Sequence, residues 1–108
     1  MKLPTEVFGD VVVVHTPEEL SDDLRSQIAE FLTTLDRRQV IVDLNGTESI
    51  DSGGLEALLT VQDMLREQQG DLKISTNNKV NRKILEVTRL DEQLEVFDSV
   101  IDAVKSFV

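Results

Sequence analysis

Residues 39–59 read QVIVDLNGTESIDSGGLEALL and contain the pattern that decides the fold. Residues 39–44 are an apolar, β-branched run with little alternation, which predicts a strand covered on both faces of a sheet. Asn45 and Gly46 predict a turn. Residues 53–68 then predict a helix that ends before Gly70 and Asp71. Functional loops of layered α/β proteins lie where strands end and helices begin, and the segment before this helix is such a loop.

Four further segments have the composition of strands. Residues 6–8 and 11–15, EVF and VVVVH, flank Gly9 and Asp10 and predict two strands joined by a tight turn. LKIS at residues 72–75 alternates like a strand, and LEVF at residues 94–97 predicts a short one.

A helix is predicted directly after the second of these strands, over HTPEELSDDLRSQIAEFLTTLDRR (residues 15–38). Thr16 is a suitable N-cap, Pro17 fits the first helical position and Glu19 completes a capping box. The expected apolar stripe of this helix consists of Leu20, Leu24, Ile28, Phe31, Leu32 and Leu35.

Two more helices complete the chain. Asn77 or Asn78 is expected to cap the third helix, and Asp98 the last. The last helix is expected to turn four apolar side chains inward: Val100, Ile101, Val104 and Phe107. Strands alternating with helices predict one α/β domain over residues 1–108, with a mixed, mostly parallel sheet of four to five strands and about four helices.

The composition narrows the functional classes. The 108 residues include 21 acidic and 11 basic side chains, a formal charge of −10 that repels nucleic acid and anionic membranes. There is no cysteine, and therefore no disulfide or cysteine-based metal site. The single histidine, His15, is expected to be a strand-end residue. No apolar run approaches the ~20 residues of a membrane span and the N-terminus is unlike a secretory signal, so we expect a cytoplasmic protein without membrane insertion.

The segment Asp51-Ser52-Gly53-Gly54 places two helix-capping residues directly before two glycines in the first turn of the predicted helix. Asp51 and Ser52 are both good N-caps. Gly53 and Gly54 destabilise a helix, and either close packing against the sheet or access of another protein's active site to Ser52 has to offset that cost. No catalytic base is evident for Ser52, so we expect a substrate serine in a protein that is not an enzyme. Whether the protein itself binds a nucleotide is not decided by the sequence.

The predicted helix over residues 53–68 carries a second apolar stripe of Ala57, Val61 and Met64, beside the face formed by Leu55, Leu58, Leu59, Gln62 and Leu65. The second stripe is either a docking surface or covered by the third or fourth helix.

Residues 40–59, VIVDLNGTESIDSGGLEALL, resemble the core of STAS domains, and in particular the stand-alone anti-sigma-factor antagonists. The family signature is an apolar strand ending in Asp-Leu, a short loop, and Asp-Ser-Ser/Thr-Gly-Leu opening a helix. Asp43-Leu44 and Asp51 to Leu55 occupy these positions, and RLDEQLEVFDSVIDAV resembles the closing strand and helix.

The resemblance implies a regulatory binding protein that controls sigma-factor-dependent transcription. The unphosphorylated antagonist binds an anti-sigma factor that is also a serine kinase. That kinase uses its own ATP to phosphorylate Ser52, the antagonist is released, and a phosphatase resets it. The antagonist needs no cofactor of its own. The residues expected at the partner surface are Asp51, Ser52, Gly53, Gly54, Ala57, Val61 and Met64.

The sequence departs from the family pattern at two places. Gly53 stands where a serine or threonine is usual, which leaves Ser52 as the only hydroxyl of the motif. His15-Thr16-Pro17 replaces a segment that usually resembles Gly-Glu-Leu. Two other roles of STAS domains remain as alternatives: a scaffold subunit of a signalling complex, and an accessory subunit of a lipid-transport ATPase.

Overall fold

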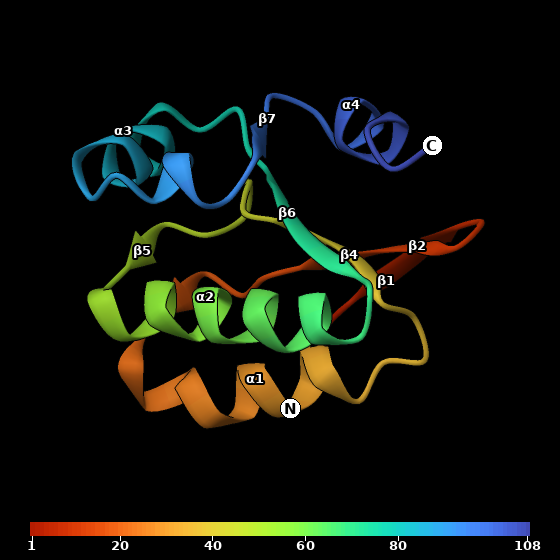
Figure 1. The fold of residues 1–108 in the computed structure, drawn as a ribbon. Coiled ribbons are helices and arrows are strands. Elements are labelled where there is room, and N and C mark those ends of the chain that lie inside the picture. The colour runs from red at the N-terminus through yellow and green to blue at the C-terminus, as the bar shows by residue number, and fades with distance from the viewer.

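A mixed five-stranded sheet forms the centre of the computed structural model, which describes all residues from 1 to 108 (Figure 1). Its strands, in spatial order, are β1 (Thr5–Phe8), β2 (Val11–His15), β4 (Gln39–Asp43), β6 (Asp71–Ser75) and β7 (Val96–Phe97). The β1–β2 pair is antiparallel and the other three pairs are parallel, which confirms the predicted mixed sheet. Gly9 has φ +62° in the predicted hairpin turn.

The helices are α1 (Arg25–Thr33), α2 (Ser52–Glu67), α3 (Lys79–Val87) and α4 (Val100–Lys105), with single 3₁₀ turns at η1 (Asp22–Leu24) and η2 (Leu90–Glu92). Figure 1 shows α1 and α2 side by side on one face of the sheet, with α4 on the other. No helix combines the length and the hydropathy that a bilayer crossing needs.

Alternating strand residues supply two cores, one on each face of the sheet. Val40 and Val42 belong to the larger cluster of 18 buried residues together with Leu58 of α2. Ile41 points to the opposite face, into a cluster of four buried residues that includes Ala103 of α4. Because both faces of β4 are covered, its apolar residues run without interruption, as the sequence predicted.

The predicted start of the first helix is wrong. Thr16, Pro17 and Glu19 do not form a capping box, and α1 begins only at Arg25. The preceding segment is extended: β3 (Glu19–Leu20) pairs in parallel with β5 (Ser49–Ile50) in a two-stranded sheet that was not predicted. Leu20 is fully buried, but as a residue of this strand and not as part of a helical apolar stripe. A tertiary contact therefore overrides the local capping signal.

The last helix also differs in detail. Ser99 is its N-cap in place of Asp98, because the Ser99 hydroxyl accepts the N–H of Asp102 at 3.1 Å. Ile101, expected to face inward, is 54% exposed, and Ala103 is the buried residue of this helix. In the third helix Asn78, one of the two predicted candidates, is the N-cap.

Candidate functional site

The loop before α2 ends in the predicted helix cap. Asp51 is extended, and its Oδ1 accepts the backbone N–H of Gly54 at 2.9 Å. Its Oδ2 accepts the backbone N–H of Asp22 at 3.0 Å. The Asp22 N–H and then the Gly54 N–H lower the pKa of the Asp51 carboxyl, with the charge of Arg25 as a smaller contribution. Asp51 therefore caps α2 and joins the loop to the segment that leads into α1.

Ser52 is the first residue of α2 and is exposed to solvent. The hydrogen bonds of this turn use the Asp51 side chain and the backbone, and none of them uses the Ser52 hydroxyl. The hydroxyl lies at the edge of a shallow depression of about 250 Å³, lined by Ser52, Leu55, Glu56, Leu59, Thr88 and Leu90. The structure therefore places a free hydroxyl beside a partly apolar surface formed by α2 and the segment after α3.

The two glycines after Ser52 are buried and do not form a surface for a partner. A Cβ on Gly53 would collide with Asp22, and a Cβ on Gly54 would collide with the carbonyl of Leu20. Of the two reasons considered for these glycines, the structure shows the close packing. The contacts are with Leu20 of β3 and Asp22 of η1, and they correct the expectation that Gly53 and Gly54 bind a partner directly.

The apolar stripe of α2 that was a candidate docking surface is mostly covered. Ala57 and Val61 are fully buried and belong to the larger core together with Ile28 of α1. The covering element is α1, which lies against α2, and not α3 or α4. Of this stripe only Met64 reaches the surface, with 41% of its area exposed. Ala57 and Val61 are therefore core residues, which corrects their expected role at the partner surface.

Arg25 belongs to this site but was not predicted from the sequence, where it only forms part of a solvated helix face. Its Nη2 lies 2.6 Å from Glu56 Oε2 and 3.1 Å from Asp22 Oδ1, so the guanidinium connects the start of α1 to the first turn of α2. Glu56 is 31 positions away in the chain, and only the packing of α1 against α2 brings the two together. The motif itself has no basic residue, so this charge reaches it through the fold.

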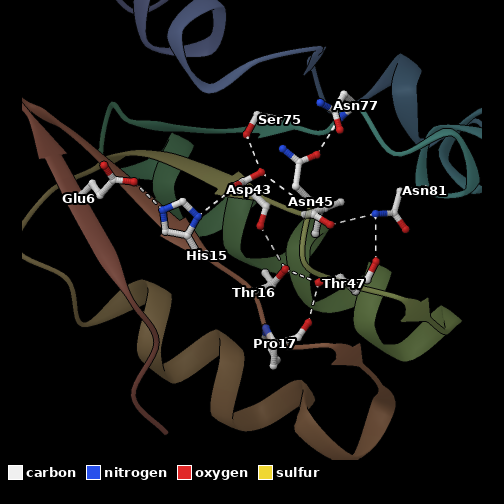
Figure 2. Close-up of polar contacts among 11 residues, drawn as sticks. Glu6, His15, Thr16, Pro17, Asp43, Asn45, Thr47, Ser75, Asn77 and Asn81 are labelled. Atoms are coloured by element: carbon white, nitrogen blue, oxygen red, sulfur yellow. Dashed lines mark hydrogen bonds and ion pairs between the residues drawn. The ribbon is translucent and has the colours of Figure 1, made fainter.

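Polar side chains and carbonyl groups from α3 and from the segment after β2 form hydrogen bonds that fix the loop between β4 and α2 (Figure 2). The Asn81 amide on α3 donates to the carbonyls of Leu44 at 2.9 Å and Thr47 at 3.2 Å. The Thr47 hydroxyl donates to the carbonyl of Pro17 at 2.6 Å and also contacts the Thr16 hydroxyl. Thr47 and Asn81 are both buried, so α3 and the segment after β2 position the loop.

His15 is the last residue of β2, as expected, and it bridges two carboxylates at the same edge of the sheet (Figure 2). Its Nε2 lies 2.7 Å from Glu6 and its Nδ1 2.8 Å from Asp43. The Asp43 carboxylate also accepts hydrogen bonds from the Ser75 hydroxyl and the backbone N–H of Asn45. Burial lowers the pKa of His15, but the contacts with Glu6 and Asp43 outweigh it, and the pKa is raised above 6.5.

The exposed part of the site therefore consists of the Ser52 hydroxyl, an anionic rim and a partly apolar depression. The rim contains Asp22, Asp51 and Glu56 with Arg25 among them. Such a surface suits contact with another protein, where apolar area is desolvated and polar groups at the rim give specificity.

A protein-family model described as "STAS domain" matches residues 2–103. Among solved structures, an anti-sigma factor antagonist from Mycobacterium paratuberculosis has a TM-score of 0.80 at 20% identity, covering 97% of this chain and 92% of that one. The phosphorylated form of the Bacillus cell fate determinant SpoIIAA has a TM-score of 0.67 at 17% identity, covering 99% and 100%. A sulfate transporter family protein from Wolinella succinogenes reaches 0.80 at 18% identity, covering 94% and 87%. At these identities the likeness shows the fold alone.

Proposed function

Because this chain belongs to the STAS-domain family, we propose that it is an anti-sigma-factor antagonist whose partner binding is switched by phosphorylation of Ser52. The unphosphorylated protein binds an anti-sigma factor that is also a serine kinase, and phosphorylation releases it. The observation that carries the proposal is the exposed Ser52 hydroxyl at the start of α2, beside a partly apolar depression.

The surface proposed for the partner differs from the stripe expected from the sequence. It is the depression next to Ser52, where Leu55, Leu59 and Leu90 supply the apolar lining. Met64 lies twelve residues further along α2, about 18 Å from Ser52 at 1.5 Å per residue, and is a peripheral contact at most. Asp51 and Glu56 are the carboxylates of the anionic rim that lie nearest to the serine in the sequence.

Charge and desolvation explain why phosphorylation weakens such a complex. A phosphate adds −1.5 to −2 charges at neutral pH. At Ser52 these charges lie beside Asp51 and Glu56, on a surface that a partner has to desolvate. A loss of about 3 kcal/mol lowers the affinity more than a hundredfold. The chain contributes the acceptor hydroxyl, while the ATP and the phosphoryl transfer belong to the kinase, and a phosphatase resets the switch.

The test is a paired affinity capture from extract of the source cells, with Ser52→Ala and Ser52→Asp variants as baits and mass spectrometry as the readout. We expect an ATP-binding serine kinase to be retained by the alanine bait and lost from the aspartate bait. Ser26→Asp is a matched control, since it adds the same charge at an exposed position of α1, and it should retain the kinase.

Retention of the same partners by the Ser52→Ala and Ser52→Asp baits would contradict the switch. The identity of those partners, whether subunits of a large signalling complex or a transport ATPase, would then assign one of the two alternative roles.

A further inference from the structure

Arg25 holds an unusual position among the charged groups around Ser52. Its guanidinium contacts Glu56 at 2.6 Å and Asp22 at 3.1 Å, and its charge also acts on Asp51. Two carboxylates therefore pair with one arginine, and a third, Asp51, lies within the range of its charge. Asp51 directly precedes Ser52 in the sequence, and Glu56 follows it by four positions.

The contact with Glu56 brings this guanidinium close to Ser52. Residues four positions apart lie on the same face of a helix, with their Cβ atoms about 5–6 Å apart, so Ser52 and Glu56 are neighbours on α2. Both line the same depression. A group that extends from the Ser52 hydroxyl toward Glu56 therefore extends toward the side chain that now holds the guanidinium.

The present partners of Arg25 hold it weakly. The side chain of Glu56 is 61% exposed and that of Asp22 is 67% exposed, and ion pairs between solvated side chains contribute little. A phosphate on Ser52 carries up to twice the charge of either carboxylate and offers three oxygens to the planar fork of an arginine. The phosphate therefore competes with both carboxylates for the guanidinium of Arg25.

We propose that Arg25 binds the phosphate of phosphorylated Ser52, exchanging Glu56 and Asp22 for it. This inference rests on the proposed function, because it concerns the phosphorylated form. The exchange removes the cross-link from α1 to Glu56 and leaves that carboxylate free next to the phosphate. Phosphorylation then rearranges the rim of the depression as well as adding charge to it, while the rest of the domain keeps its fold.

The test uses protein in which phosphoserine is incorporated at position 52 during translation, so that no kinase is needed. A phosphorus NMR titration gives the second pKa of the phosphate in the otherwise native chain and in the Arg25→Gln and Arg25→Lys variants. The Arg37→Gln variant is the control, because it removes the same charge from an ion pair with Asp36. Circular dichroism shows that each variant is folded.

We expect the second phosphate pKa to rise by about half a unit in Arg25→Gln, as loss of a solvated ion pair implies. Arg25→Lys should restore part of the difference, and Arg37→Gln should leave the pKa unchanged. Equal values in Arg25→Gln and the native side chain, with both proteins folded, would overturn the inference.

This result does not depend on whether a kinase or anti-sigma factor exists, since the phosphate is installed independently. The same phosphorylated protein used as bait tests the proposed function separately. If the phosphate pKa depends on Arg25 but phosphorylation does not change partner binding, Arg25 still binds the phosphate, and the proposed switch is refuted.

Discussion

His15 Nδ1 lies 2.8 Å from the carboxylate of Asp43, joining the carboxyl ends of the neighbouring strands β2 and β4. Asp43 is 8% exposed, whereas Glu6, the second partner of His15, lies at the surface on β1. The imidazole thus connects a buried carboxylate to an exposed one. The buried carboxylate, Asp43, also accepts the N–H of Asn45, at the start of the loop that carries the candidate site.

The contact should make stability depend on pH in a defined direction. The His15 pKa is raised in the folded state above the ordinary value of 6.5, because the two carboxylates outweigh the effect of burial. Its contribution to stability is therefore fully present below the unfolded pKa and is lost as the pH rises through the folded pKa. Denaturant unfolding across this range, in the native protein and in His15→Gln, should show a difference that shrinks toward high pH. Since His15 is the only histidine, NMR measures its pKa directly, and a value below 6.5 would contradict the prediction.

Gly54→Ala should destabilise the domain through a steric collision. The added Cβ meets the carbonyl of Leu20 in β3, so the start of α2 and β3 have to move apart. We expect a loss of about 2 kcal/mol in the free energy of unfolding, as for other overpacked sites. Gly46→Ala is the matched control, because its Cβ meets only the Thr16 carbonyl at 3.8 Å. Equal unfolding midpoints for the two variants would contradict the close approach.

Two substitutions on α2 test which part of its apolar stripe is covered. Val61→Ala removes two methyl groups from the core beneath α1 and should cost about 2 kcal/mol of unfolding free energy. Met64→Ala, at an exposed position, should change it by less than about 0.5 kcal/mol. A small effect at Val61 would mean that this side chain is not packed in solution as it is in the structure.

Asn81→Ala should loosen the loop that presents Ser52. The amide of Asn81 donates to two buried carbonyls, of Leu44 and Thr47, and its loss leaves both without that partner. We expect a loss of about 2 kcal/mol in stability and faster hydrogen exchange at the backbone N–H groups of Thr47 and Glu48. Asn77→Ala, at an exposed position just before α3, should alter neither. Unchanged exchange at Thr47 in Asn81→Ala would show that α3 does not hold the loop.

Sequence patterns that span only a few residues were sufficient to predict most of the secondary structure. The apolar run of residues 39–44, the hairpin at Gly9 and the cap at Asp51 each depend on neighbours in the chain, and the structure confirms all three. The Asp-Ser-Gly-Gly motif also located the candidate site, because a capping residue and an exposed hydroxyl are local properties of a helix start.

The errors share a physical origin in contacts between distant segments. The capping signal at Thr16 predicted a helix, but Leu20 instead pairs as a strand residue with Ile50, thirty positions away. The stripe of Ala57 and Val61 was expected at the surface because periodicity shows that a helix face is apolar, but not which element covers it.

The sequence by itself determined the order of the five central-sheet strands and the four α-helices, and the residue that carries the exposed hydroxyl, because these follow from propensities and hydrogen bonds within one or two turns of chain. The tertiary structure decided that Gly53 and Gly54 lie against residues 20–22, that α1 covers one face of α2, and that Arg25 reaches the rim beside Ser52. These contacts join residues about 30 positions apart, and their formation depends on how the helices pack on the completed sheet.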